Sequence, residues 1–285
     1  MNAAAPFPDS APEPVSSSPK TGRNLPLAIA TGVLLAGAFV GSLYWHPLAL
    51  LTLIAVLVVV ALLELDSAFA EHGVRPATVV AIASGAVAIY GGYFAGAAAQ
   101  TLAVLLLLVG AIGWAVVTAR DRVTATVSVT LLVGVWVPVC ASFAALLVAR
   151  PDGLWYVMAT VALAVSADIG AYGTGVAFGR HKMAPRISPG KTWEGAIGGS
   201  LTVLLLAGFV TAGLPGFDLV TALVLGIAVT VAATLGDLTE SLVKRDLGVK
   251  DLGRILPGHG GIMDRVDSII FALPAAHFVL LAVGV

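Results

Sequence analysis

The chain has 285 residues, of which 59% are hydrophobic and only 11% are charged. A soluble globular domain carries about 25% charged residues, so this balance excludes one and indicates that most of the chain lies in lipid. The net charge of −1 says little about partners, because the side of the membrane on which each charge lies matters more than the sum. We expect no nucleic-acid partner.

Residues 1–23 are rich in proline and serine. Such a segment cannot bury enough apolar surface to offset the entropy lost on ordering, so we expect a disordered cytoplasmic tail. Apolar runs of about 18 or more residues follow, each long enough for a helix to cross a hydrocarbon core about 30 Å thick. We predict an all-α, polytopic integral membrane protein with about nine transmembrane helices, at about 25–45, 47–65, 76–97, 100–118, 124–149, 153–179, 195–214, 217–242 and 268–285.

The spans divide into N-terminal transmembrane helices over 24–150 and a C-terminal transmembrane region over 151–285, which contains two charged loops, 180–194 and 243–267. If the N-terminus is cytoplasmic, every Lys and Arg except Arg150 lies on one side of the membrane. The positive-inside rule assigns that side to the cytoplasm. We therefore expect a cytoplasmic N-terminus and an external C-terminus.

Acids, hydroxyls and cations stand at helical spacing around the second charged loop. Asp237, Ser241 and Lys244 fall at i, i+4 and i+7, along one helix face that can hold a metal ion and a phosphate together. Asp264 and Asp267 fall at i and i+3 as the last span begins. Mg²⁺ prefers hard oxygen ligands on separate rigid elements, completed by water and substrate phosphates, so these acids favour a magnesium site. An ordinary basic loop beside anionic lipids would explain the Lys and Arg residues, but not acids set into the membrane boundary.

The segment 257–261 lies between these acids and contains Gly260 and Gly261. Glycines let backbone N–H groups approach an oxyanion, here just before a helix N-terminus that favours negative charge. Arg265 points away from the acids and can bind an anion through two parallel hydrogen bonds. This part of the chain therefore suits phosphate as well as metal.

A second polar stretch runs from Asp168 to Gly195. Asp168 lies inside an apolar span with Tyr172 one turn on, and the pair either makes a helix-to-helix hydrogen bond or lines a polar cavity. Groups suited to a phosphate, a base edge or a metal follow: Ser188, Lys191, Thr192 and Glu194. Taken alone, this stretch is a weak signal.

The run from Ser241 to Asp267 resembles the signature of CDP-diacylglycerol synthases, also called phosphatidate cytidylyltransferases. The matching residues are Ser241, Lys244, Arg245, Lys250, Asp251, Pro257, His259, Gly260, Gly261, Asp264, Arg265 and Asp267. The stretch from Asp168 to Gly195 is similar to that family's other shared region, apart from Gly190, where the family often has a second Lys. The N-terminal half matches only as apolar spans.

The resemblance implies the reaction of CTP with phosphatidic acid to give CDP-diacylglycerol and pyrophosphate in phospholipid biosynthesis, at the cytoplasmic side of the plasma membrane among its lipids. It also implies an all-helical fold that often forms homodimers, with Mg²⁺ on Asp237 and Asp264 and a second, monovalent cation such as K⁺. The expected catalytic residues are Ser241, Lys244, Arg245, Lys250, Asp251, His259, Arg265 and Asp267. The expected substrate-binding residues are Asp168, Tyr172, Ser188, Lys191, Thr192, Glu194, Gly260 and Gly261.

Residue chemistry fits this reaction, because the protein must bring two polyanions together and neutralise them. We expect the CTP phosphates at Lys244, Arg245 and Arg265, and phosphatidate at Lys191 and Ser188. His259 either transfers a proton or orients a phosphate, and an attacking phosphate that is already ionised favours the second role.

Two other functions are compatible with an apolar chain of this kind. A CTP-dependent kinase of polyprenyl alcohols would also need CTP, metal and a lipid, but its acceptor hydroxyl would need a general base. An ion-coupled transporter would carry acids near the bilayer midplane on broken helices. The acids of this chain gather at one membrane boundary, which favours surface chemistry.

Overall fold

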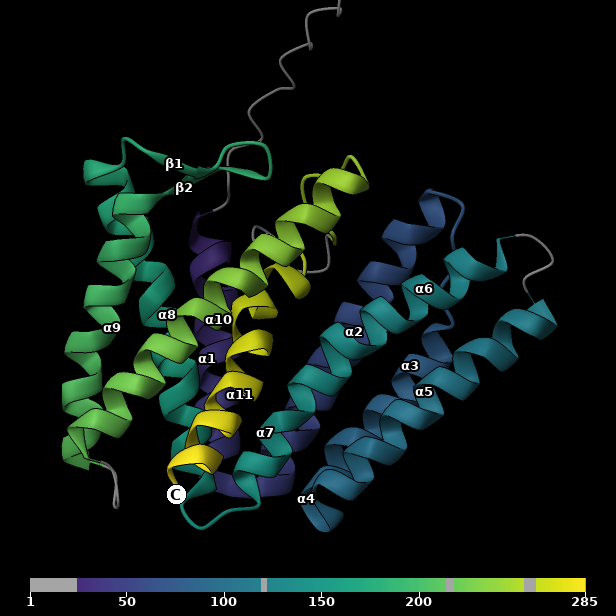
Figure 1. Cartoon of the computed structure of the whole chain (residues 1–285), viewed down its shortest axis with the longest axis horizontal. Coiled ribbons are helices and arrows are strands. Elements are labelled where there is room, and N and C mark those ends of the chain that lie inside the picture. Colours follow the sequence, from purple (N-terminus) through teal and green to yellow (C-terminus); the bar gives the residue numbers. More distant parts are fainter. Residues whose placement is uncertain (1–24, 119–121, 214–217, 254–259, 285) are drawn as a thin grey trace, which may run out of the picture.

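The computed structural model describes residues 25–118, 122–213, 218–253 and 260–284. These residues form one bundle of helices that run up and down, with a small β-hairpin at one end (Figure 1). The all-α membrane architecture expected from the sequence is therefore confirmed, with the hairpin as an addition. The predicted tail, 1–23, lies outside the described residues.

The helices, including two π-helical segments η1 and η2, and the strands follow one another along the chain. They are α1 (Leu25–Trp45), α2 (Pro47–Glu71), α3 (Thr78–Ala86), η1 (Val87–Gly91), α4 (Gly92–Ala95), α5 (Ala97–Thr118), α6 (Val123–Gly134), η2 (Val135–Val139), α7 (Cys140–Val148), α8 (Gly153–Phe178), β1 (Lys182–Ala184), β2 (Ser188–Thr192), α9 (Trp193–Gly213), α10 (Leu219–Asp246) and α11 (Met263–Val283).

Within the described residues, 7 helical segments are long and apolar enough to cross a membrane. They are Pro47–Glu71, Thr78–Ala95, Ala97–Thr118, Val123–Val148, Gly153–Phe178, Leu219–Asp246 and Met263–Val283. Two shorter apolar helices, Ala30–Trp45 and Trp193–Phe209, stand where the first and seventh spans were predicted. The protein is thus a multi-pass membrane protein, whereas the number nine and the orientation of the termini stay predictions.

Helices extend beyond the predicted spans at the end that carries the charged residues. α10 continues to Asp246 and α11 begins at Met263, so both ends of the predicted loop 243–267 are helix. The predicted loop 180–194 contains the antiparallel hairpin β1–β2, which pairs Lys182 with Thr192. These boundaries differ because hydropathy marks only the apolar window, while backbone hydrogen bonding continues through polar residues.

Small residues let neighbouring helices of the C-terminal half pack closely. An added Cβ at Gly199 of α9 would lie 2.6 Å from the carbonyl oxygen of Ala167 on α8, so only glycine fits this contact. Association of helices in lipid depends on such close packing, because lipid tails are as apolar as the side chains they replace. The α8–α9 and α10–α11 pairs form the frame on which the polar residues are carried.

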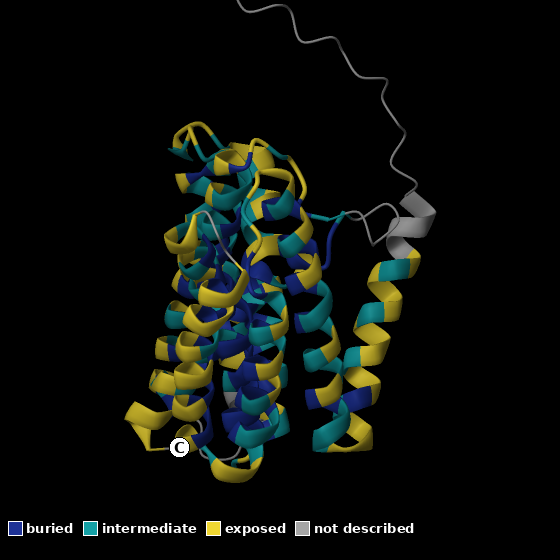
Figure 2. Cartoon of the chain, turned by 90° about the vertical axis from the view of Figure 1, so that its right-hand side faces the viewer, coloured by how far each residue is buried: buried dark blue, intermediate teal, exposed yellow. Residues whose placement is uncertain are grey.

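The N-terminal half contacts this frame through α2 and α7. Pro138 lies in the π-helical segment η2 between α6 and α7, and its missing N–H accounts for the local break in α-helical hydrogen bonding. Gln100 of α5 donates a buried hydrogen bond of 2.8 Å to Ser142 of α7. α1 stands at the edge of the bundle, where α2 is its main neighbour, and its described side chains are largely exposed (Figure 2).

Candidate active site

The β-hairpin brings Lys191 to the second half of α10. Its Nζ lies 2.8 Å from Oδ2 of Asp237 and donates a 3.3 Å hydrogen bond to the carbonyl oxygen of Thr234. Arg245, farther along α10, donates from Nε to the carbonyl oxygen of Ile187 at 3.1 Å, which ties the hairpin to the helix. The two polar stretches of the sequence are therefore in direct contact.

Two predicted substrate-binding residues stabilise the hairpin and the start of α9. Thr192 is 4% exposed, and its hydroxyl accepts a 3.1 Å hydrogen bond from the backbone N–H of Gly195. Glu194 accepts hydrogen bonds from the backbone N–H groups of Arg180 and His181 and lies 2.6 Å from Nδ1 of His181. The His181 hydrogen bond, with these backbone donors, holds the pKa of Glu194 far below its usual range, at about 2. Glu194 is thus an ionised carboxylate whose described contacts shape the hairpin.

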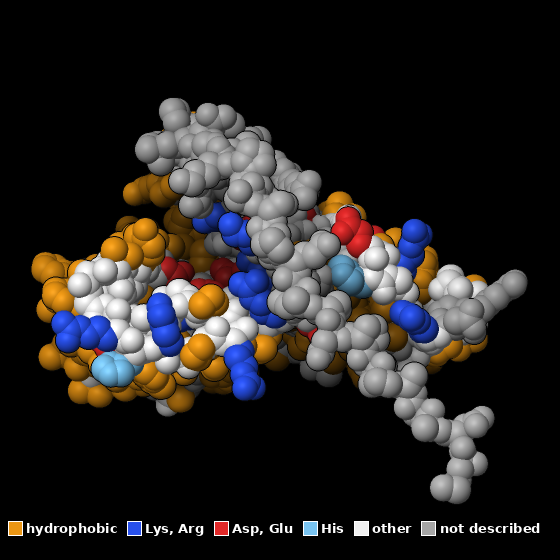
Figure 3. Space-filling model, turned by 90° about the horizontal axis from the view of Figure 1, so that it is seen from above, with side chains coloured by type: hydrophobic (Ala, Val, Ile, Leu, Met, Phe, Trp, Pro, Cys, Tyr) orange, Lys and Arg blue, Asp and Glu red, His pale blue; other side chains and the backbone are white. Residues whose placement is uncertain are grey.

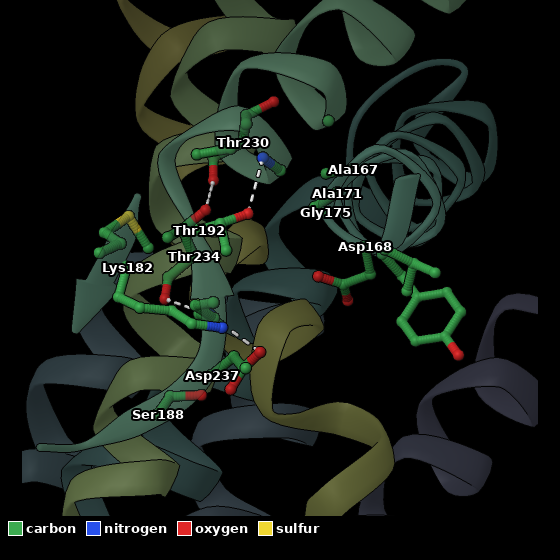
Figure 4. Close-up of a pocket in the computed structure, with 18 residues that line it drawn as sticks. Ala167, Asp168, Ala171, Gly175, Lys182, Ser188, Thr192, Thr230, Thr234 and Asp237 are labelled. Carbon is green, nitrogen blue, oxygen red and sulfur yellow. Dashed lines mark hydrogen bonds and ion pairs between the residues drawn. The ribbon is translucent and has the colours of Figure 1, made fainter. Parts of the chain in front are cut away.

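A cavity of about 610 Å³ lies between α8, the hairpin, α9 and α10. Asp168 and Asp237 face the same space from different helices (Figure 4). Six of the residues expected from the sequence line it: Asp168, Tyr172, Ser188, Lys191, Thr192 and Asp237. The structure supports both roles left open for Asp168, because this residue lines the cavity and its carboxyl group also hydrogen-bonds to Ser268 of α11.

Close packing of α10 and α11 brings their acids together. An added Cβ at Gly236 would collide with the carbonyl oxygen of Asp267, so only glycine allows this approach next to Asp237. Ser241 donates a 3.3 Å hydrogen bond to Oδ1 of Asp237, one turn away on the same face, as the spacing predicted. Asp267 is 8% exposed and interacts electrostatically with Asp237.

Lys244 links the two helices. Its Nζ lies 2.7 Å from Oε2 of Glu240 and is paired with Oδ1 of Asp264 on α11. The other oxygen of Asp264 accepts a 2.8 Å hydrogen bond from the backbone N–H of Gly261. The start of α11 is thereby joined to the end of α10 through one ammonium group and two carboxylates.

Of the remaining predicted residues, Gly260 and Asp251 lie beside this cluster. Gly260 has a φ of +83°, and an added Cβ there would lie 3.3 Å from Oδ2 of Asp264 and 3.7 Å from Oδ1 of Asp251. Lys250 is exposed. His259 lies outside the described residues, so its predicted role stays a prediction. Arg265 is exposed on the first turn of α11 and lines a different cavity.

Lys and Arg side chains gather on the end of the bundle that carries the hairpin, and acidic side chains lie recessed between them (Figure 3). Recessed acids flanked by surface cations suit a polyanion together with a metal ion. This end of the molecule therefore carries the candidate active site.

Comparison with known proteins identifies the family. A model of the cytidylyltransferase family matches residues 27–283. The chain belongs to the cytidylyltransferase family. A phosphatidate cytidylyltransferase of Mycobacterium leprae is 35% identical over a region that covers 89% of this chain and 86% of the relative's length. One from Mycobacterium bovis is 34% identical over 94% and 92%. One from Haemophilus influenzae is 46% identical over 127 residues, which are 43% of this chain and 44% of the relative.

The candidate active site also contains two buried acids that sequence reasoning missed. Glu64 of α2 is 3% exposed, and its two oxygens accept 3.1 Å hydrogen bonds from the backbone N–H groups of Ile262 and Met263. Glu240 of α10 is also 3% exposed. Glu64 could have been found as a carboxylate in an apolar span, the criterion that singled out Asp168. Glu240 stands four residues before Lys244, the spacing of a helical ion pair.

The donors of this cytidylyltransferase fit Mg²⁺. No three acidic, histidine or cysteine side chains of the described segments form a ready-made ligand cluster. Mg²⁺ is usually held by one or two carboxylates and otherwise by water and substrate phosphates, so a complete protein cage is not required. Oε1 of Glu240 is buried with no hydrogen-bond partner among the described residues, close to the Asp264–Lys244 pair. A buried acceptor of this kind, beside paired carboxylates, matches a hard cation.

Proposed function

We propose that this cytidylyltransferase transfers the cytidylyl group of CTP to phosphatidate, giving CDP-diacylglycerol and pyrophosphate. The similarity along most of the chain to enzymes named phosphatidate cytidylyltransferase supports this substrate pair. The observation that carries the proposal is the joining of both polar stretches at Lys191 and Asp237, which are 2.8 Å apart. One site at the membrane boundary can then hold a nucleotide triphosphate and a lipid phosphate.

The reaction is a displacement at phosphorus. An oxygen of the phosphatidate phosphate attacks the α-phosphorus of CTP, the bond from that phosphorus to the oxygen bridging the β-phosphorus breaks, and pyrophosphate leaves with the bonding electrons. The attacking phosphate is already ionised near pH 7, so no general base is required. The protein's part is to position two polyanions and to neutralise the charge on the departing pyrophosphate.

Lys191 and Lys244 are suited to that part. The ammonium group of Lys191 is paired with Asp237, and that of Lys244 is paired with Asp264. A triphosphate competes for the same ammonium groups, and their transfer to phosphate leaves both carboxylates able to hold a metal ion. Mg²⁺, when bound, neutralises the triphosphate and the departing pyrophosphate. A second, monovalent cation such as K⁺ is part of the proposal only through the family resemblance.

We propose a different division of the two substrates from the one that the sequence suggested. That division assumed that Lys191 lies away from the metal site, whereas it contacts Asp237 directly. We therefore assign Lys191 to the nucleotide, in the first cavity. Ser188 lines the same cavity and goes with it.

The site faces the cytoplasm of a plasma-membrane protein in this proposal, because every Lys and Arg but Arg150 lies on one side in the topology derived above. A reporter fused after Val285 is expected outside the cytoplasm, and one inserted in the hairpin turn, 185–187, inside. Finding both reporters on the same side would contradict the orientation but leave the chemistry untouched. Homodimer formation, implied by the resemblance, can be measured on the same purified protein.

The experiment that tests the function is turnover of CTP by purified protein in mixed micelles. Pyrophosphate is expected only when phosphatidate and Mg²⁺ are both present, with CDP-diacylglycerol formed in equal amount. A polyprenyl alcohol kinase would release CDP, and a transporter would release neither. CDP release with a polyprenyl alcohol, or no lipid-dependent turnover, would overturn the proposal.

A further inference from the structure

A second cavity, of about 300 Å³, lies between α1, α2, α7, α8 and α11. Its volume is at the lower end of ligand pockets, which range over about 300–1,000 Å³. The lining is apolar and includes Phe39 of α1, Leu57 of α2, Val165 of α8 and Leu273 of α11. Among the lining residues that the structure describes, Arg265 alone is charged. None of the first cavity's residues belongs to it.

The cavity follows one face of α11. Arg265, Ile269 and Leu273 succeed one another at four-residue spacing on that face, and all three line the cavity. At 1.5 Å per residue, the distance from Arg265 to Leu273 is about 12 Å along the helix. The cavity thus begins at a cation beside the membrane boundary and continues as an apolar space toward the middle of the bilayer. A cation at one end of an apolar space suits a phosphate group and the first part of one acyl chain.

The opposite face of α11 belongs to the active site, since Asp264 and Asp267 point there. Side chains on a helix lean toward its N-terminus, so Asp264 and Arg265, both in the first turn, reach toward the same end of α11. A phosphate bound by Arg265 therefore lies at the end of α11 that also carries the acid cluster. The cavity and the acid cluster are therefore two sides of one helix end.

We propose that the second cavity binds an acyl chain of phosphatidate, with Arg265 binding the phosphate. This inference rests on the proposed function and adds to it the place of the lipid substrate. Charge complementarity identifies the ligand, because a phosphate monoester matches the two parallel donors of a guanidinium group. α1 forms the outer wall, and since α2 is its main neighbour, the lipid reaches the cavity from the bilayer along α1.

The shape of the cavity matters more for the reaction than the free energy of burying the acyl chain. An acyl chain that moves from the bilayer into an apolar cavity leaves one hydrocarbon environment for another, so its burial contributes little affinity. The walls instead hold the chain, and with it the phosphate, in one position, which favours reaction by orientation. A bulkier wall should therefore exclude long chains while leaving the nucleotide site intact.

Kinetics of Val165→Phe in mixed micelles test this. We expect the KM for dioleoyl phosphatidate to rise about tenfold, near the low end of the discrimination that a pocket achieves for a small change in fit. The KM for CTP should stay unchanged, and the effect should shrink for dihexanoyl phosphatidate, whose chains are too short to fill the cavity. Arg265→Gln should raise the phosphatidate KM for both chain lengths. The matched control is Val40→Phe on α1, which is 47% exposed against 42% for Val165 and does not line the cavity.

The inference would be overturned if Val165→Phe raised the KM equally for long-chain and short-chain phosphatidate. It would also be overturned if the KM for CTP rose by the same factor. Labelling by phosphatidate with a photoreactive acyl chain tests binding without turnover. Labelled peptides are expected from α1, α8 and α11, with labelling reduced by Val165→Phe and by unlabelled phosphatidate. If phosphatidylcholine reduced the labelling as strongly as phosphatidate does, the cavity would bind any bilayer lipid. That result would also refute the inference. If the wild type makes no CDP-diacylglycerol, the proposed function fails, and the labelling still decides whether the cavity binds phosphatidate.

Discussion

Glu64 lies in the N-terminal half of the chain, but we expect it to support the active site. The Glu64→Gln variant should therefore have a lower kcat. Each carboxylate oxygen of Glu64 accepts a 3.1 Å hydrogen bond from a backbone N–H group at the start of α11. A helix N-terminus also favours negative charge. Gln keeps one acceptor oxygen and replaces the other by an NH₂ donor, so one N–H group loses its partner. An unpaired buried N–H group costs about 1–3 kcal/mol.

If this free energy destabilises the conformation in which α11 is placed for catalysis, kcat drops about 5- to 150-fold. The assay is kcat with CTP and phosphatidate both saturating, alongside the thermal unfolding midpoint in detergent. Glu64→Asp, which keeps the charge on a shorter side chain, should recover part of the activity. Glu71→Gln, at the exposed end of the same helix, is the matched control and should behave as wild type.

Wild-type kcat in Glu64→Gln would refute this reasoning, because the first turn of α11 would then not depend on the buried carboxylate. A lower unfolding midpoint with unchanged kcat would refute it too, since Glu64 would then stabilise the fold without positioning Asp264. The prediction requires kcat to fall in the folded protein.

Three further results are expected. Asp237→Asn and Asp264→Asn should each abolish pyrophosphate release while the protein stays folded, since losing a metal ligand removes several kcal/mol of transition-state stabilisation; near-normal turnover at saturating Mg²⁺ would exclude the metal assignment. Lys191→Ala should raise the KM for CTP more than the KM for phosphatidate, because removing an ammonium group that binds the phosphates of one substrate need not weaken binding of the other. A larger rise in the KM for phosphatidate in steady-state kinetics would restore the division expected from the sequence. Gly236→Ala should lower both activity and the unfolding midpoint by separating α10 from α11 at Asp267, whereas Gly113→Ala, in open space on α5, should not destabilise.

The sequence alone determined the membrane character, the helical architecture and the two polar stretches of the site. These features are local: an apolar run of sufficient length specifies a helix in lipid whatever surrounds it. The spacing of Asp237 and Ser241 likewise predicted a shared helix face, and the two side chains are hydrogen-bonded. Family resemblance pointed to the same residues because its motif is contiguous in the chain.

Only the tertiary structure decided which distant residues meet. Lys191 and Asp237 pair across two elements far apart in the chain, and Glu64 reaches Met263 from the other half of the chain. No periodicity encodes such contacts, since they depend on how closely helices approach, and that is set by single small residues such as Gly236. The second cavity has the same origin: its walls come from five helices, and Arg265 lies at its end because Asp264, one residue earlier, faces the acid cluster on the other side of α11.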